Sequence, residues 1–225
     1  MAIKMIVSDI AGTTIVDTDY VAIAFIEAFL NEGIDLKVDE IKPLMGFKKT
    51  EAISTVLESK GVDTNAIMIN RIHDNFQMNM IKFYSASLEV EPLPGVENFF
   101  QHCKERDIVV TLNSGFPKVI VDVILDRMGW LESGLVSSVI ASDEVEHGRP
   151  SAEMIEVLMK RHGITDAAEI LKVGDTMVDV QEGRNAKCGM VVAVTTGAYK
   201  KEDLQKFEPD FIIDHFGELS NLIWH

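Results

Sequence analysis

The stretch SDIAGTT at positions 8–14 places an acidic side chain beside groups that can surround a phosphoryl group. Asp9 comes after the apolar run IKMIV and one serine, and its carboxylate can attack phosphorus to form an acyl phosphate. Gly12 and Thr13 follow, and we expect the backbone there to help hold the transferring group. Asp9 is therefore a candidate nucleophile.

Polar groups also follow other apolar runs of the chain. NSG at 113–115 ends one run, GDTMVD at 174–179 ends another, and HGRP at 147–150 precedes a helical pattern that begins near Ser151. The positions of interest are Asn113, Ser114, Gly115, Arg149, Asp175 and Asp179. Because ligands of open α/β sheets bind at the carboxyl ends of the strands, we expect these groups to converge on Asp9.

The three carboxylates of Asp9, Asp175 and Asp179 repel one another unless a cation compensates their charge. Oxygen ligands of this kind favour Mg²⁺. Ser114 and Arg149 would then bind the remaining phosphoryl oxygens. Ordinary helix capping could explain some of these residues singly, but complementary groups at all four of these strand ends favour a functional site.

The elements that must position these groups follow an alternating pattern. Apolar, β-branched runs without polar alternation predict buried parallel strands at 3–9, 108–114, 137–142, 170–175, 190–196 and 210–214. Amphipathic patterns predict helices near 95–106, 117–129, 151–162, 177–187 and 216–223. This order predicts an α/β fold, a Rossmann-like doubly wound parallel sheet.

The segment 17–88 interrupts this alternation with helical patterns only. Gly33 and Gly61 are expected helix ends, Thr50 is an expected N-cap, and a long helix is expected over 64–86. We predict an all-helical cap domain over 17–88 and a core domain made of 1–16 and 89–225. An insert after the first strand would lie beside the carboxyl ends of the strands and could cover the site.

The motifs DIAGTT, LNSG, the Arg149 segment and GDTMVDVQEG resemble, in order, those of the haloacid dehalogenase (HAD) superfamily of phosphotransferases. The resemblance implies a Mg²⁺-dependent hydrolase that works through an aspartyl phosphate on Asp9. It implies that Asp9, the backbone carbonyl of Ala11, and Asp175 bind the metal, with Asp179 nearby. The helical insert stands where that superfamily has its small cap.

Ala11 departs from the commonest form of the first motif, which has an acid there to protonate a leaving alcohol. DxAGTT, with Arg149 and with EGRNA at 182–186, is similar to the phosphonoacetaldehyde hydrolases, or phosphonatases, which cleave a carbon–phosphorus bond. Such a bond has no leaving oxygen to protonate. Carbon needs an electron sink instead, and an imine formed by a lysine can supply one.

The resemblance identifies Lys49 as that lysine, because MGFKK at 45–49 matches a Met-Gly-x-x-Lys segment of the phosphonatase cap. Met45, Gly46 and Lys48 are then expected near the substrate, with the Lys48 charge favouring a neutral Lys49 amine. The alternative is a solvated pair of lysines at the start of a helix.

Three other positions differ from the phosphonatase pattern. Ala52 stands for a histidine of the cap, Asp19 for a cysteine and Phe116 for a tyrosine. The proton transfers of imine formation would need another acid, for which Glu51 and His73 are candidates. The alternatives are therefore a HAD-superfamily phosphatase of small phosphate monoesters, or a non-catalytic ligand-binding protein on the same fold.

Composition limits the partners. The net charge is −15, which disfavours nucleic acid and anionic membrane surfaces. The sequence has no run of about 18 apolar residues and no signal-peptide pattern, and Cys103 and Cys188 are isolated. We expect a cytoplasmic enzyme that acts on a small phosphorylated or phosphonate substrate, and we leave a homodimer open.

Overall fold

The computed structural model describes residues 2–224 and contains a six-stranded sheet. Its strands are β1 Met5–Ser8, β2 Val109–Ser114, β3 Ser138–Ala141, β4 Ile170–Gly174, β5 Met190–Val194 and β6 Phe211–Ile213. All neighbouring strands are parallel, in the order β3-β2-β1-β4-β5-β6. The predicted Rossmann-like doubly wound sheet is confirmed.

The sheet is covered on both faces, which explains why its strands are apolar throughout. Side chains alternate between the two faces of a strand. In β1, Ile6 joins one cluster of buried side chains, whereas Met5 and Val7 join another. The first cluster includes buried residues of the helices Val96–Lys104, Lys118–Met128 and Leu219–Ile223, and the second includes those of the helices Glu153–His162, Met177–Asn185 and Lys201–Leu204.

The helices around the sheet precede β2, connect the later successive strands, or follow β6. They are α5 Val96–Lys104, α6 Lys118–Met128, α7 Glu153–His162, α8 Met177–Asn185, α9 Lys201–Leu204 and α10 Leu219–Ile223. Short 3₁₀ turns lie at Lys42–Leu44, Ser142–Glu144, Ala167–Glu169, Gln205–Phe207 and Phe216–Glu218. Gly129 and Gly163 end α6 and α7 in the left-handed conformation that favours glycine.

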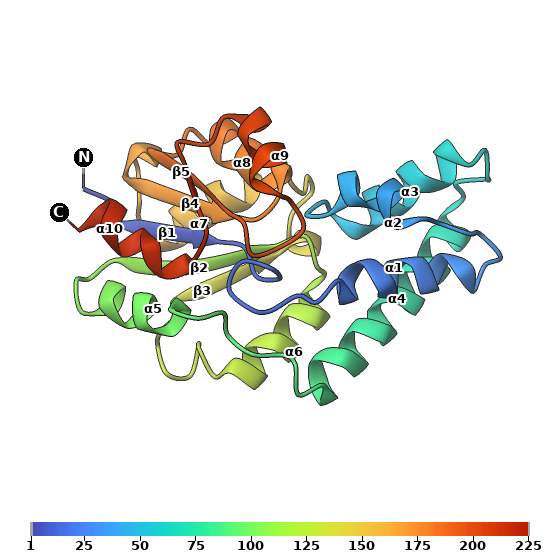
Figure 1. Cartoon of the computed structure of the whole chain (residues 1–225), viewed down its shortest axis with the longest axis horizontal. Coiled ribbons are helices and arrows are strands. Elements are labelled where there is room, and N and C mark those ends of the chain that lie inside the picture. Colours follow the sequence, from blue (N-terminus) through green and yellow to red (C-terminus); the bar gives the residue numbers. More distant parts are fainter. Residues whose placement is uncertain (1, 225) are drawn as a thin grey trace.

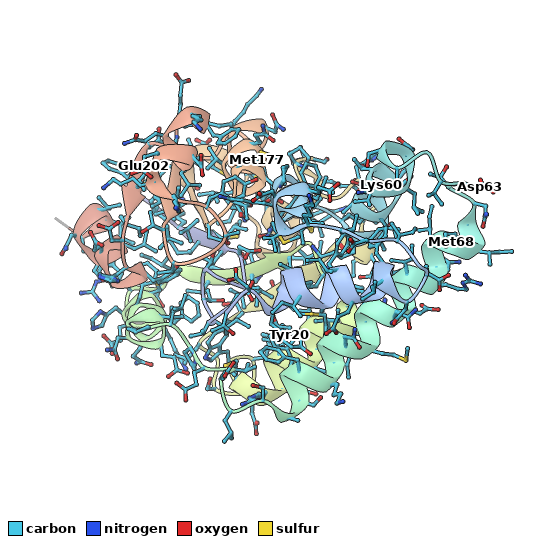
Figure 2. All side chains as sticks on the ribbon, turned by 45° about the vertical axis from the view of Figure 1, so that its right-hand side comes forward. Tyr20, Lys60, Asp63, Met68, Met177 and Glu202 are labelled. Atoms are coloured by element: carbon cyan, nitrogen blue, oxygen red, sulfur yellow. The ribbon has the colours of Figure 1, made fainter. Side chains whose placement is uncertain are left out.

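The helical insert, 17–88, follows β1 and lies on the right of Figure 1, beyond the carboxyl ends of the strands. It contains α1 Tyr20–Leu30, α2 Val38–Ile41, α3 Lys49–Ser59 and α4 Ala66–Ala86. Lys60, Asp63 and Met68 mark the end of the insert that is furthest from the sheet (Figure 2). The division of the chain into two domains stays a prediction.

Apolar packing joins the insert to the sheet-bearing part of the chain. α4 packs against α1 on one side and against α6 on the other. The rings of Phe76 and Tyr84, both in α4, lie 6.2 and 6.0 Å from the ring of Phe116, which follows β2. Buried residues of both parts belong to one cluster. The insert therefore shares its apolar interior with one face of the sheet.

The loop 45–48 of the insert lies directly against the strand ends. A Cβ atom on Gly115 would lie 2.5 Å from the carbonyl oxygen of Gly46 and 2.6 Å from that of Phe47. Gly46 has φ 86°, and a Cβ atom there would lie 2.7 Å from Oγ1 of Thr176. Glycine at these two positions lets the loop close over the sheet edge.

Two helix starts differ from the sequence predictions. α3 begins at Lys49 with Lys48 as its N-cap, so Thr50 already lies inside the helix. α7 begins at Glu153, two residues after Ser151, and Glu153 accepts hydrogen bonds from the backbone N–H groups of Glu146 and His147 ahead of the helix. Among residues 2–224, no helix combines the length and the apolar character needed to cross a membrane.

Gly115→Ala tests the contact between the loop 45–48 and the sheet edge. The added methyl group would overlap the carbonyls of Gly46 and Phe47, so we expect a loss of about 1–3 kcal/mol in the free energy of unfolding. Faster amide hydrogen exchange in 45–48 should accompany it. Gly217→Ala is the control, because the nearest atom to its Cβ position is 3.9 Å away, and it should change stability by less than about 0.5 kcal/mol. Equal effects of the two substitutions would contradict a tight contact.

Candidate active site

The strand ends bring three carboxylates together. β1 and β4 are paired with Ser8 opposite Val173, so Asp9 and Asp175 follow adjacent strand ends, and the N–H of Asp9 donates to the carbonyl of Val173 at 3.0 Å. One carboxylate oxygen each from Asp9, Asp175 and Asp179 lies within 4.8 Å of the others. We call these three residues the acidic cluster, and all three are buried.

The members of the acidic cluster differ in their proton affinity. Burial raises the pKa of Asp9 to about 6, with the charge of Asp179 adding to it and that of Arg149 opposing it. Burial, followed by the charges of Asp9 and Asp179, raises the pKa of Asp175 well above its usual value. Burial would also raise the pKa of Asp179, but the charges of Arg149 and Lys172 hold it below its usual value. Asp9 and Asp175 therefore lack full charge compensation from the protein.

Both oxygens of Asp175 are fixed in place. Oδ1 accepts a hydrogen bond from Oγ1 of Thr13 at 3.0 Å, and Oδ2 accepts one from the N–H of Ala198 at 2.8 Å. Gly12, at φ 80°, and Gly197 pack against the same carboxylate, where a side chain at position 197 would collide with it. Thr13 and Gly12 thus act on Asp175 in this structure, and neither lies in the wall of the site cavity described below.

Arg149 stands behind Asp9 and is fully buried. Its Nη1 donates to Oδ1 of Asp9 at 2.6 Å and lies 3.0 Å from Oδ1 of Asp179. Its Nη2 donates to the backbone carbonyl and to Oδ1 of Asn113. The sequence prediction placed Arg149 on phosphoryl oxygens, whereas here the guanidinium holds Asp9 and does not line the site cavity.

A second buried cation, Lys172 in β4, completes this arrangement. Its Nζ lies 3.0 Å from Asp179 and 3.0 Å from Glu182, and it donates to Oδ1 of Asn113 at 2.8 Å. Asn113 donates in turn to Glu182 at 2.7 Å. Asn113 was predicted beside the phosphoryl group, but it is fully buried within this network.

Lys172 and Glu182 were not among the site residues predicted from the sequence. Lys172 is the only charge inside the apolar strand ILKVG, and Glu182 lies three residues after Asp179, on the same face of α8. A buried charge needs partners, so a lysine within a buried strand next to an acidic motif was the available signal.

A cavity of about 40 Å³ lies between the acidic cluster and the insert, and we call it the site cavity. Its wall on the sheet side consists of Asp9, Ala11, Ser114, Gly115, Phe116, Asp175, Thr176 and Ala198. Asp17, Val21, Met45, Gly46 and Lys49 complete the wall from the linker and the insert. The predicted Met45, Gly46 and Lys49 therefore lie in the same cavity as Asp9.

Lys49 presents an amine to this cavity from the first turn of α3. Its side chain is 2% exposed, and Nζ lies 5.8 Å from the ring centre of Phe76 and 5.6 Å from that of Phe116. Burial lowers the pKa of Lys49 to about 8, against the opposing charge of Asp9. A substantial fraction of the amine is therefore neutral and nucleophilic in mildly alkaline solution.

Lys48 points elsewhere. Its Nζ donates to the carbonyls of Val145 and Glu146 at 3.1 and 3.2 Å, and it does not line the site cavity. Burial, and not the Lys48 charge expected from the sequence, is the main cause of the lowered pKa of Lys49. Lys48 instead ties the loop 45–48 to the sheet-bearing part of the chain.

Ser114 ends β2 inside the cavity wall. Its Oγ accepts a hydrogen bond from the N–H of Phe116 at 3.1 Å, which leaves the hydroxyl proton free for a ligand. Gly115 follows in the same wall, under the loop 45–48. Ser114 and Gly115 thus lie in the same cavity wall as Asp9. An oxyanion bound beside Asp9 could accept hydrogen bonds from them.

The profile of the haloacid dehalogenase-like hydrolases matches residues 6–194. The chain belongs to this family. The predicted resemblance and the prediction of a hydrolase are thereby confirmed.

Among curated relatives, this hydrolase is 28% identical over 199 residues to a phosphonoacetaldehyde hydrolase from Latilactobacillus sakei, covering 82% of this chain and 72% of that one. It is 26% identical over 261 residues to a phosphonoacetaldehyde hydrolase from Bordetella avium, covering 98% and 90% of the two chains. The predicted similarity to phosphonatases is confirmed at this level of identity.

Solved structures share the fold of this hydrolase. A hydrolase from Pseudomonas syringae has a TM-score of 0.86 at 17% identity, with 97% and 96% of the two chains covered. A phosphonoacetaldehyde hydrolase like protein from Oleispira antarctica has a TM-score of 0.84 at 23% identity, with 99% and 92% covered. A predicted phosphoglycolate phosphatase from Haemophilus somnus has a TM-score of 0.79 at 17% identity, with 98% and 97% covered.

The acidic cluster has the chemistry of a divalent-cation site. Asp9 and Asp175 are buried carboxylates whose pKa values are raised, mainly by burial, and their oxygens are the kind of ligand that hard cations such as Mg²⁺ prefer. Asp179 lies in the cluster, but its oxygens already contact Thr176, Lys172 and Arg149. Asp9 and Asp175 are thus the better-placed direct ligands, and Asp179 anchors the cations behind them.

Magnesium titration followed by thermal unfolding tests this site. At 100 times its dissociation constant a ligand stabilises a protein by about 2.7 kcal/mol, or roughly 5–10 °C for a chain of this size. The shift should be larger at pH 8 than at pH 5.5, because Asp9, with a pKa raised to about 6, binds a proton in place of metal at the lower pH.

Asp175→Asn should remove the magnesium-induced shift, whereas Asp126→Asn, at an exposed position of α6, should keep it. A shift of the same size in Asp175→Asn would place the metal elsewhere.

Proposed function

We propose that this hydrolase cleaves the carbon–phosphorus bond of phosphonoacetaldehyde or a related small phosphonate, with Mg²⁺ and an aspartyl phosphate on Asp9. The observation that carries the proposal is the buried amine of Lys49 in the same cavity as Asp9. Ala11 lies in that cavity as well, where an ester phosphatase of this superfamily has its acid.

The phosphoryl half of the substrate would bind between Asp9 and Ser114. Bound Mg²⁺, held by Asp9, Asp175 and the Ala11 carbonyl, would compensate the negative charge of the phosphoryl oxygens. The hydroxyl of Ser114 donates to one of these oxygens. Arg149 holds Asp9 at 2.6 Å, which fixes one carboxylate oxygen and leaves the other for attack.

The organic half would react with Lys49. Its neutral amine adds to the aldehyde, and uptake of one proton with loss of water gives a cationic imine. Asp9 then attacks phosphorus, the electron pair of the C–P bond moves to carbon, and the imine becomes a neutral enamine. The enamine takes up a proton at carbon, one water releases the aldehyde from Lys49, and another releases phosphate from Asp9.

The enclosed site favours a small substrate. The cavity of about 40 Å³ is bordered by the loop 45–48 and by the rings next to Lys49. A substrate of two or three carbons with one phosphoryl group suits a cavity this small and enclosed better than a nucleotide or a polymer does. Opening of the insert would admit the substrate, and its closure would exclude bulk water.

A phosphate monoester phosphatase is the second candidate. The structural similarity to a protein named a predicted phosphoglycolate phosphatase favours it, as does a charged fraction of Lys49 that could bind a substrate carboxylate. In that case Ala11 would leave the departing alkoxide without an acid, and turnover would be slow.

A substrate panel assayed for released phosphate separates these candidates. With Mg²⁺, phosphonoacetaldehyde should be turned over faster than 2-phosphoglycolate, because Lys49 can activate only the aldehyde. Asp9→Asn should lower the rate by about 10³-fold or more. A preference for the ester would favour the phosphatase, and turnover that Asp9→Asn leaves unchanged would contradict the nucleophile.

Borohydride trapping at a series of pH values tests the lysine. An adduct on Lys49 should form in the presence of the aldehyde substrate, and its rate should rise with pH through a midpoint near 8, since the pKa of Lys49 is lowered to about 8. An ordinary lysine would give a midpoint of about 10.4. Lys49→Met should abolish the adduct, whereas Lys82→Met, at an exposed position of α4, should not. An adduct that persists in Lys49→Met would identify a different amine.

A further inference from the structure

Imine formation at Lys49 requires an acid, and the two candidates suggested by the sequence lie outside the site cavity. Glu51 is exposed on α3. The ring nitrogens of His73, on α4, lie 3.3 Å from Nε2 of Gln77. Neither residue is in the cavity wall. The organic side of the cavity therefore needs a different acid.

Within the part of the chain that the structure describes, Asp17 is the remaining carboxyl group in the cavity wall besides Asp9 and Asp175. It belongs to the linker between β1 and α1, outside the acidic cluster. Lys49 and Asp17 attract each other, because the charge of each shifts the pKa of the other toward its ionised form. The carboxyl group of Asp17 thus acts on the amine across the same small space.

One oxygen of Asp17 has a structural role and the other does not. Oδ1 accepts hydrogen bonds from the N–H groups of Tyr20 and Val21 at 3.0 and 3.4 Å, at the start of α1. Within residues 2–224, no hydrogen bond to Oδ2 is formed. The helix start therefore orients the carboxyl group and leaves Oδ2 available to a ligand in the cavity.

We infer that Asp17 is the acid–base group that serves Lys49 during imine formation and hydrolysis. This inference rests on the proposed function. Burial raises the pKa of Asp17 above its usual value despite the two backbone donors, which favours the protonated form that the step needs.

The step balances without any further reactant. The neutral amine of Lys49 adds to the aldehyde carbon, and a proton moves from nitrogen to oxygen to give a carbinolamine. Protonated Asp17 donates its proton to the carbinolamine hydroxyl, the C–O bond breaks, and water leaves. The nitrogen lone pair forms the C=N bond, so the products are a cationic imine and the Asp17 carboxylate. In the reverse direction, this carboxylate accepts a proton from the water that attacks the imine.

Asp17→Asn isolates the chemical role from the structural one. Asparagine keeps the Oδ1 acceptor for the start of α1 and caps helices as well as aspartate does, but it cannot donate a carboxylic proton. Asp19→Asn is the matched control. Asp19 lies two residues further along and is exposed, and its φ of 63° is one that asparagine tolerates. The substitution Asp19→Asn therefore removes the same charge from the same helix end without touching the cavity.

The test uses acetaldehyde with borohydride and measures the rate at which the Lys49 adduct accumulates, by mass spectrometry of the full-length protein and its peptides. Asp17→Asn should slow the adduct by about 10²-fold, and Asp19→Asn should match the unsubstituted protein. Binding of inorganic phosphate with Mg²⁺, measured by calorimetry, should be the same in all three, because it does not involve the amine.

Three other results would contradict either the role of Asp17 or the proposed function. Adduct formation in Asp17→Asn at the rate of Asp19→Asn would overturn the role of Asp17. A parallel loss of phosphate binding and thermal stability in Asp17→Asn would also overturn it, since that pattern indicates a structural role alone. If the unsubstituted protein forms no adduct at Lys49, the proposed function itself fails, whatever Asp17 does.

Discussion

Asp9, Asp175 and Asp179 are buried, and one carboxylate oxygen of each lies within 4.8 Å of the others. Their negative charges repel one another, and much of the surrounding structure compensates this repulsion. Two buried cations, Arg149 and Lys172, compensate the charge of Asp179, and Arg149 also holds Asp9 from behind. Their charge falls mainly on Asp179, whose pKa is lowered, while the pKa values of Asp9 and Asp175 stay raised. The protein thus leaves negative charge that is not fully compensated on the side that faces the cavity, where a metal ion and a phosphoryl group would bind.

Closure of the helical insert extends the same principle to the amine. The loop 45–48 packs on Gly115, and Phe76 and Phe116 border Lys49, so the contacts that close the cavity also remove water from the amine. Removal of water disfavours the charged ammonium and thereby lowers the pKa of Lys49. Opening of the insert would return Lys49 to solvent and restore the ordinary ammonium. Nucleophilicity at this residue is therefore coupled to the closed arrangement.

Sequence reasoning predicted the sheet and the helical insert because both have strong periodic patterns, and parallel strand ends must converge. It therefore brought Asp9, Ser114 and Asp175 to one edge. It did not predict that Arg149 and Asn113 lie behind the nucleophile, because the direction of a side chain depends on packing that spacing along the chain does not encode. Lys172 and Asp17 were missed for a related reason: what each of them faces, Asp179 for Lys172 and the site cavity with Lys49 for Asp17, depends on packing.

Phe116 takes part in two kinds of packing at once. Its ring borders the amine of Lys49 and also contacts Phe76 and Tyr84, which belong to the apolar interior of the insert. A substitution that reshaped the pocket at this position would disturb the seating of α4 and change the exposure of the amine. Residues that share partners in this way show non-additive effects. During divergence toward new substrates, position 116 would thus be epistatic with α4, and a change of specificity through this ring would require compensating replacements in that helix.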